Sequence, residues 1–280
     1  MHRLKLVKEL KVWLLGIAAG LMALHISLIW HIESTDFLGT SVLFWIAVSS
    51  LIWKKHQTLY LESSVFSSFL GILLIAWVLL KSARIDSYDP FLRLSPFVSA
   101  LGLGLLASGI KGLKQYWQEI VLLGFLVIPP SLILALIDFT SLTAKFSVFL
   151  LWYLGFNVYR QDLNVILPTG IIEIGHGCSG VTAIIQLLGL AFIFLVMFPT
   201  NRGEKILVPV VAAVLAFTVN AARIVLLAIL SAFSNHEAFN YWHGGDGSLI
   251  FSVISVLIFG FFCRFLLLRD EPKQQKSGEV

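Results

Sequence analysis

Long apolar blocks recur along the chain, and they constrain its fold more than any other feature of the sequence. A helix needs about 20 apolar residues to cross a bilayer core, because backbone groups in lipid must be hydrogen-bonded within the segment. Hydrophobic residues make up 58% of the 280 residues and charged residues only 13%, whereas soluble domains have about 45–50% and about 25%. The sequence therefore predicts an all-α polytopic membrane protein.

Eight blocks have the length and composition of a transmembrane helix. A ninth, 141–156, contains Lys145, Trp152 and Tyr153, which are typical of the membrane interface. We predict that it is an interfacial or re-entrant helix; the alternative is a ninth crossing. The eight predicted spans are 12–30, 37–53, 65–80, 95–110, 119–137, 179–198, 206–232 and 248–268, and the tryptophans expected as interfacial anchors are Trp13, Trp30, Trp53, Trp117, Trp152 and Trp242.

The distribution of Lys and Arg predicts the orientation. With a cytoplasmic N-terminus, 14 of the 20 lie on the inner side and five on the outer side, while Arg223 lies inside a span. This bias predicts a multi-pass protein of the cell membrane with both termini in the cytoplasm. We expect the first block to be retained rather than cleaved as a signal peptide. The basic residues sit in short clusters that orient helices, so we expect no nucleic-acid binding.

The chain is expected to form one integral membrane domain over 1–280. Within it we distinguish N-terminal spans over 1–114, a core over 115–268 and a cytoplasmic tail over 269–280. Between residues 157 and 180 the runs Asn164–Leu167 and Ile171–Ile174 flank Pro168-Thr169-Gly170, a pattern typical of a β-hairpin. We predict a short extracytoplasmic hairpin there.

Three polar clusters stand out, and all lie in the last 110 residues. They are Glu173-Ile-Gly-His-Gly-Cys-Ser-Gly-Val, then Asn220-Ala-Ala-Arg223, and then Tyr241-Trp-His243-Gly-Gly-Asp-Gly-Ser. Arg223 lies about 17 residues into its span, or ~25 Å at 1.5 Å per residue, in a core of roughly 30 Å. The predicted topology therefore brings all three clusters to the outer face.

These residue types fit cysteine chemistry. Cys178 precedes a predicted helix, whose dipole we expect to lower the thiol pKa. A histidine can accept the thiol proton and return it to a leaving amine, and both His243 and His176 are candidates. Arg223 can hold a thiolate, a carbonyl or an oxyanion. Small neighbours such as Gly177 and Gly180 would let a substrate backbone approach, and Ser179 and Asn220 complete the predicted supporting residues.

Each residue also has a structural interpretation. A membrane cysteine is usually a small hydrophobe, as expected for Cys263. Arg223 can pair structurally with Asn220, and His243 can be an interfacial side chain. His176, Cys178 and His243 lack standard zinc spacing and a fourth ligand, so we expect no metal and no cofactor. At the level of the whole chain, the alternatives are a transporter or channel that uses Arg223 for an anionic solute, and a structural scaffold.

Cys178-Ser-Gly-Val at a helix start, Asn220-x-x-Arg223-Ile and His243 with the glycines after it resemble the exosortase/archaeosortase family over roughly residues 115–268. Two departures, at Glu173–Cys178 and Gly244–Gly247, leave the subtype open, with a cyanobacterial type as one candidate. The resemblance implies a cysteine transpeptidase with Cys178 as nucleophile, Arg223 as positioning or oxyanion residue and His243 as general acid/base. It also implies partners: membrane-tethered substrates with a C-terminal Pro-Glu-Pro-type motif, a transmembrane helix and a basic tail, and an acceptor of unknown identity.

The charge bias generates the first test. Asp246 and residues 157–177 should face the extracytoplasmic side, so Asn164→Cys should react with an impermeant maleimide in intact cells or spheroplasts. Labelling only after permeabilisation would mean that block 141–156 crosses the membrane and that the predicted orientation is wrong.

Overall fold

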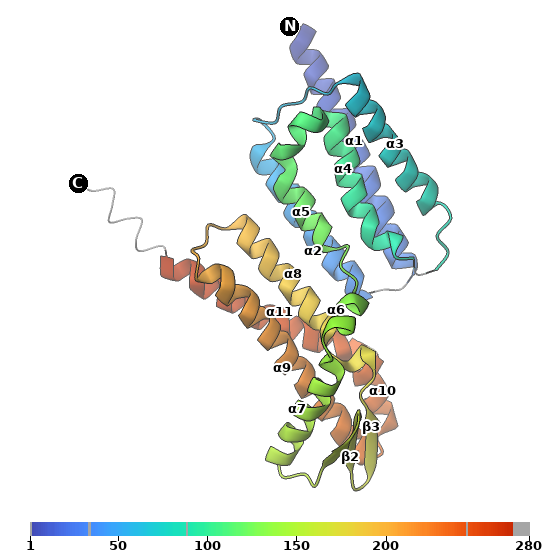
Figure 1. The fold of residues 1–280 in the computed structure, drawn as a ribbon, viewed down its shortest axis with the longest axis vertical. Helices are drawn as coiled ribbons and strands as arrows, with labels where there is room; N and C mark the ends of the chain where they lie inside the picture. The colour runs from blue at the N-terminus through green and yellow to red at the C-terminus, as the bar shows by residue number, and fades with distance from the viewer. Residues whose placement is uncertain (1, 33–34, 88, 245, 271–280) are drawn as a thin grey trace, which may run out of the picture. The chain divides into compact units, whose positions relative to one another are not determined.

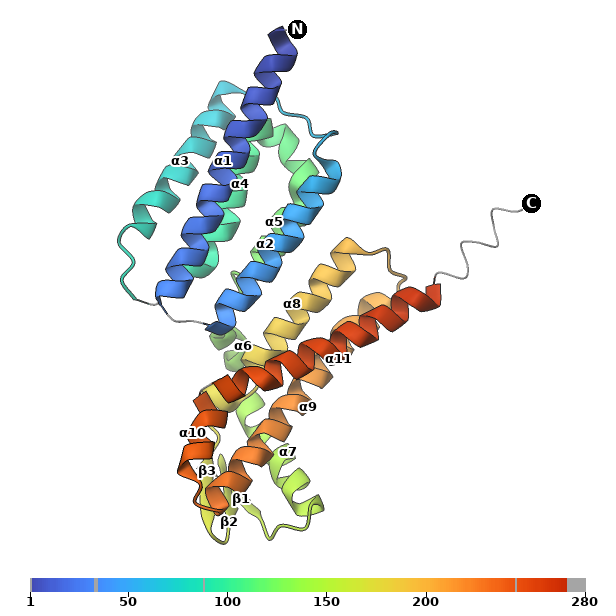
Figure 2. The same ribbon diagram turned by 180° about the vertical axis from the view of Figure 1, so that it is seen from behind.

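The computed structural model describes residues 2–32, 35–87, 89–244 and 246–270. The side chains of residues 2–8, 35–36, 176, 246 and 269–270 lie outside the description, as does the predicted tail from residue 271. The chain divides into two compact units, Met1–Pro129 and Pro130–Val280. The helices and strands of each unit are shown in Figures 1 and 2.

The first unit consists of helices. Helix α4 breaks at Gly109, whose φ of 66° is left-handed, and Figure 1 shows α5 running back beside α4. Helices α3 and α4 approach closely, because a Cβ on Gly71 would lie 2.7 Å from the Gly102 oxygen. The elements are α1 (His2–His31), α2 (Thr35–Lys55), α3 (Val65–Ser82), α4 (Phe91–Gly112), the 3₁₀ helix η1 (Leu113–Tyr116) and α5 (Trp117–Phe125).

Buried polar side chains of this unit have specific partners. The Trp45 indole donates to His25 Nδ1 at 3.1 Å, and His25 Nε2 lies 3.0 Å from the Leu92 carbonyl. Because Nδ1 accepts, the imidazole is neutral and Nε2 donates. Lys55 forms a 2.8 Å ion pair with the buried Glu119. These contacts join α1, α2, α4 and α5 within the unit.

The second unit combines helices with a small sheet. Strands β1, β2 and β3 form an antiparallel sheet in that order, and β2 and β3 are joined through Pro168 and Thr169. The elements are α6 (Pro130–Leu136), α7 (Phe139–Tyr153), β1 (Tyr159–Gln161), β2 (Asn164–Leu167), β3 (Gly170–Glu173), the 3₁₀ helix η2 (His176–Cys178), α8 (Val181–Met197), α9 (Glu204–Ala232), α10 (His236–Gly244) and α11 (Asp246–Asp270).

Helix α9 contributes to two separate cores of this unit. Its first half packs against α8 and α11 around Ala212 and Ala216. Its second half packs against α7 and one face of the sheet around Ile224, Leu227 and Ala228. One buried stripe at four-residue spacing joins the halves, since side chains four apart share a helix face. Its members are Val208, Ala212, Ala216, Asn220, Ile224 and Ala228.

The membrane-spanning helices agree only in part with the prediction. Six helical segments of the described residues are long and apolar enough to cross a membrane, or seven if α6 and α7 are counted as one bent span. These helices do not confirm the expected count of eight. Helix α8 has 17 residues, at the lower limit of spanning length. The six segments are Glu9–His31, Phe37–Lys55, Val65–Ser82, Phe91–Phe125, Glu204–Ala232 and Gly247–Leu268.

The predicted continuous span 119–137 is wrong. Helix α5 ends at Phe125 and α6 begins at Pro130, because Pro129 and Pro130 lack the N–H groups that would continue the helix. Helices α6 and α7 meet at 78°, where the side chain of Asp138 caps α7 by accepting from the Ser141 N–H. Whether α7 is interfacial, re-entrant or part of a crossing stays a prediction, as does the core boundary at residue 115.

The buried stripe of α9 generates the second prediction. Ala216→Leu should lower the stability by about 1–3 kcal/mol, because added volume at a packed helix contact forces displacement. The measurement is the midpoint of thermal unfolding in detergent. Val214→Leu on the exposed side of α9 is the matched control and should leave the midpoint nearly unchanged. Equal midpoints for the two variants would contradict close packing at Ala216.

Candidate active site

Cys178 and His243 lie in direct contact although they are 65 residues apart in the chain. The Cys178 Sγ is 3.4 Å from the His243 Nε2, within hydrogen-bonding distance for sulfur. Cys178 ends η2 and is 7% exposed, whereas His243 lies in the last turn of α10 and is exposed. A thiol and an imidazole nitrogen in contact have the geometry that a nucleophile and its general base require, and the exposed histidine leaves the pair open on one side.

Asn220 holds the backbone of the cysteine. Its side-chain Nδ2 donates to the Cys178 carbonyl at 3.0 Å, and it occupies the position of the α9 stripe that faces this segment. Gly180, the N-cap of α8, has a φ of 83°, and a Cβ there would lie 2.7 Å from Asn220 Nδ2. Gly180 therefore has a structural role, because the absence of a Cβ lets Asn220 reach the Cys178 carbonyl, and its role in substrate approach stays a prediction.

Thr143 of α7 is a site residue that the sequence did not indicate. Its Oγ1 donates to the Ser179 carbonyl at 2.8 Å, and its side chain is fully buried. The Cys178 and Ser179 carbonyls are thus held by side chains from two helices. Ser179 is itself buried, and its Oγ accepts from the Val181 N–H at 3.4 Å. A single threonine inside an apolar block gives no sequence signal for its hydrogen-bond partner, so this contact can be recognised only in the folded structure.

Arg223 positions His243 through the backbone. Its Nε donates to the Trp242 carbonyl at 3.4 Å, and its Nη2 donates to the His243 carbonyl. A cation at the carbonyl end of a helix satisfies its last acceptors and interacts favourably with the helix dipole. The His243 ring also stacks on Phe239, one turn earlier in α10. Asn220 and Arg223 are therefore neighbours on α9 that hold the cysteine and the histidine respectively.

The pKa of the Cys178 thiol is shifted in the opposite direction to the one that the sequence predicts. Burial raises the pKa of the Cys178 thiol above its ordinary value, and the positive charge of Arg223 opposes this rise. We expected the dipole of α8 to lower the pKa. Cys178, however, precedes the N-cap Gly180 by two residues, and the dipole effect falls off within the first turn. Burial is thus the larger effect on the Cys178 thiol, and the charge of Arg223 is the effect that favours the thiolate.

The other residues singled out in the sequence differ in their surroundings. Gly177 is exposed, with open space where a Cβ would stand, as expected for substrate approach. The side chain of His176 lies outside the described part of the structure. Cys263 is buried among α8, α9 and α11, 15 residues after the end of the third polar cluster. Trp242 packs against the core that contains Cys178, whereas Trp13, Trp30, Trp53, Trp117 and Trp152 are exposed, and the interfacial position of these side chains stays a prediction.

A family model described as transmembrane exosortase matches residues 30–260. The chain belongs to this family. The match confirms the resemblance and extends it to most of the N-terminal spans, beyond the three polar clusters that first indicated it. No curated protein and no solved structure matches the chain significantly. Membership supports a membrane transpeptidase with a role in protein sorting, and the apolar helices agree with an integral membrane protein.

The opposing effects on the thiol generate the third prediction. Arg223→Gln should shift the pH profile of Cys178 alkylation to higher pH, because removing a nearby positive charge destabilises the thiolate. Arg223→Lys retains the charge and should lie closer to the wild type. The measurement is the rate of alkylation against pH, followed by mass spectrometry of the Cys178 peptide. Arg202→Gln, in the loop before α9, is the control. An unchanged or more acidic midpoint in Arg223→Gln would show that this charge does not stabilise the thiolate.

Proposed function

We propose that this exosortase is a membrane-embedded cysteine transpeptidase that cleaves and sorts exported proteins. The observation that carries the proposal is the 3.4 Å contact between Cys178 Sγ and His243 Nε2, in a chain whose family membership supports a sorting role. Its substrates have a C-terminal Pro-Glu-Pro-type motif followed by a transmembrane helix and a basic tail. The acceptor of the cleaved protein is a second substrate, and a nucleophilic group on it completes the transfer.

The reaction has two acyl-transfer steps. His243 Nε2 accepts the Cys178 proton, and the thiolate attacks the carbonyl carbon of the peptide bond to be cut. The carbon–nitrogen bond breaks, and the imidazolium gives its proton to the leaving amine of the transmembrane fragment. The upstream protein is then a thioester on Cys178. The acceptor loses a proton to His243 and attacks the thioester carbonyl, which releases the product and restores the thiol.

Arg223 supports both partners of this reaction. Its contacts with the Trp242 and His243 carbonyls keep the imidazole beside the thiol, and its charge favours the thiolate. Asn220 holds the cysteine in the matching position. A guanidinium whose charge acts on the thiol would also stabilise a developing oxyanion on the substrate. Arg223 is thus proposed as a positioning residue for His243 and an electrostatic residue for Cys178.

The proposed orientation places this chemistry at the outer membrane surface. Cys178 precedes the first turn of α8, and the 17 residues of α8 extend over ~25 Å at 1.5 Å per residue. A substrate whose transmembrane helix begins just after its cut site presents that site at the same depth. The active site therefore faces the extracytoplasmic side, with both termini in the cytoplasm.

The fourth prediction tests the chemistry. Cys178→Ala should abolish processing of a tagged reporter with a Pro-Glu-Pro motif, a transmembrane helix and a basic tail, while the protein still accumulates in membranes. Cys263→Ser should process it normally. His243→Ala should slow thioester formation by about 10²–10⁴-fold, and His176→Ala should cost much less. The measurement is a single-turnover assay that follows the thioester.

Two outcomes would contradict these assignments. Full processing by Cys178→Ala would remove the nucleophile and with it the proposed function. Loss of activity in His176→Ala with near-normal activity in His243→Ala would exchange the two histidines.

A further inference from the structure

Strand β3 leads directly into the nucleophile segment. It ends at Glu173, and only four residues separate Glu173 from Cys178. The Ile174 N–H bonds to the Leu163 carbonyl at 3.0 Å, and the Cys178 N–H bonds to the Gly175 carbonyl at 3.0 Å. The backbone from the sheet to the thiol is therefore fixed at both ends of this connection.

The open face of the sheet has an exposed apolar row. The side chains of Val165 and Ile172 point into the core with α9, so by strand alternation Ile166 and Ile171 point to the other face. Tyr159 pairs with Ile166, and Ile166 pairs with Ile171, in one row across the three strands. Tyr159 is 60% exposed and Ile171 is 63% exposed, although both have large apolar surfaces.

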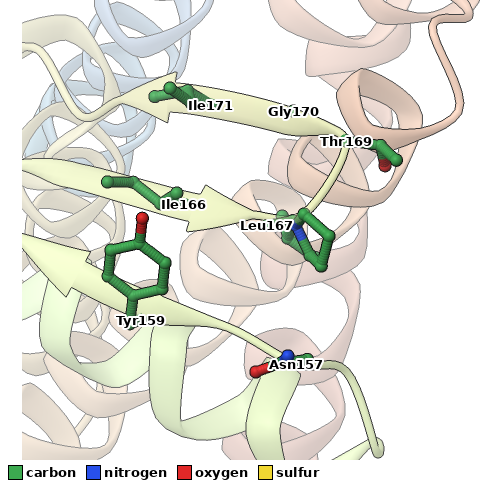
Figure 3. A pocket seen from close by; sticks show the side chains of 8 residues that line it. Asn157, Tyr159, Ile166, Leu167, Thr169, Gly170 and Ile171 are labelled. Carbon is green, nitrogen blue, oxygen red and sulfur yellow. The ribbon is translucent and has the colours of Figure 1, made fainter.

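A cavity of about 670 Å³ lies at this row (Figure 3). Its volume is within the range of small-molecule and side-chain binding sites, roughly 300–1,000 Å³. Polar groups of Asn157 and Thr169 accompany the apolar ones, and Figure 3 shows Tyr159, Ile166 and Ile171 on neighbouring strands. None of the lining residues belongs to the three polar clusters, so the cavity is a separate feature of the unit.

Exposed glycines connect the cavity with the thiol. A Cβ placed on Gly175, Gly177 or Gly244 would meet nothing within 4 Å, and all three residues are exposed. The open space at these glycines leaves room for another backbone to approach closely, because glycine has no side chain that would stand in the way. An accessible strip thus runs from Ile171 along Glu173 and Gly175 to Gly177 and the Cys178–His243 pair.

We propose that this strip and the open pocket beside it bind the extended segment of the substrate that precedes the cut bond, with one apolar side chain seated beside Tyr159, Ile166 and Ile171. The proposal rests on the proposed transpeptidase function. Extended peptides are commonly bound along exposed strands, where backbone contacts give affinity and pockets for side chains give specificity.

The order of the chain determines which substrate segment is bound. The chain enters η2, which ends at Cys178, from β3 and leaves it into α8, and Figures 1 and 2 both show the sheet and α8 extending in opposite directions within this unit. The part of the substrate after the cut bond is a transmembrane helix, which must run into the bilayer with α8. The part before the cut bond must therefore run over the sheet, where the cavity lies.

A kinetic experiment tests the cavity. Ile171→Ser should raise the KM for the tagged reporter about tenfold, because an apolar side chain loses its binding surface, and should leave the rate of thioester formation at saturation unchanged. Leu154→Ser is the matched control, since Leu154 is 60% exposed and does not line the cavity. Equal KM values for the two variants, or a loss of rate at saturation alone, would overturn the proposal.

Photocrosslinking in the full-length protein separates this proposal from the proposed chemistry. Benzoylphenylalanine in place of Ile171, in the Cys178→Ala protein in membranes, should crosslink to reporter residues on the amino-terminal side of the cut site. The same group in place of Leu154 should not. The proposed docking site would be overturned by crosslinks only to reporter residues on the transmembrane side of the cut site, or by a crosslinking yield no higher than that from position Leu154. Processing by Cys178→Ala alone would instead overturn the transpeptidase function, since the crosslink does not require the thiol.

Discussion

The shared use of α9 by two cores is the constraint on which the rest of the second unit depends. Its alanines let α8 and α11 pack closely along one half, and its Ile224, Leu227 and Ala228 support the sheet and α7 along the other. The polar residues Asn220 and Arg223 lie where the two halves meet. A shift of α9 in either core would move the supports of both Cys178 and His243 together.

Both members of the candidate pair are held through their backbones rather than through their reactive atoms. Asn220 and Thr143 donate hydrogen bonds to the carbonyls of Cys178 and Ser179, respectively. Arg223 donates to the last carbonyls of α10. The hydrogen bonds that hold the two residues therefore do not involve Sγ of Cys178 or Nε2 of His243, and these two atoms can contact each other. Burial raises the pKa of the Cys178 thiol, and the positive charge of Arg223 opposes this rise.

The differences between prediction and structure have local physical causes. The apolar blocks predicted the spans that consist of one uninterrupted helix, such as Val65–Ser82 and Glu204–Ala232. The prediction of a continuous span over 119–137 was wrong because hydropathy does not reflect the absence of backbone N–H groups at Pro129 and Pro130. The expected dipole effect on Cys178 failed because the helix begins after Gly180 and burial was not foreseeable. Trp242 packs beside the core residues around Cys178, a contact that its residue type alone does not indicate.

The sequence by itself determined the membrane class, the approximate spans and the candidate residues Cys178, Arg223 and His243, because composition, hydropathy and rare polar residues in apolar blocks are properties of the chain alone. Only the tertiary structure decided that Cys178 and His243 are in contact, that Thr143 and Asn220 hold the cysteine segment, and that Gly180 is structural. Those facts depend on distances between segments as far apart as 65 residues. Such distances are set by how α7, α9 and α10 pack on one another, and no local pattern encodes them.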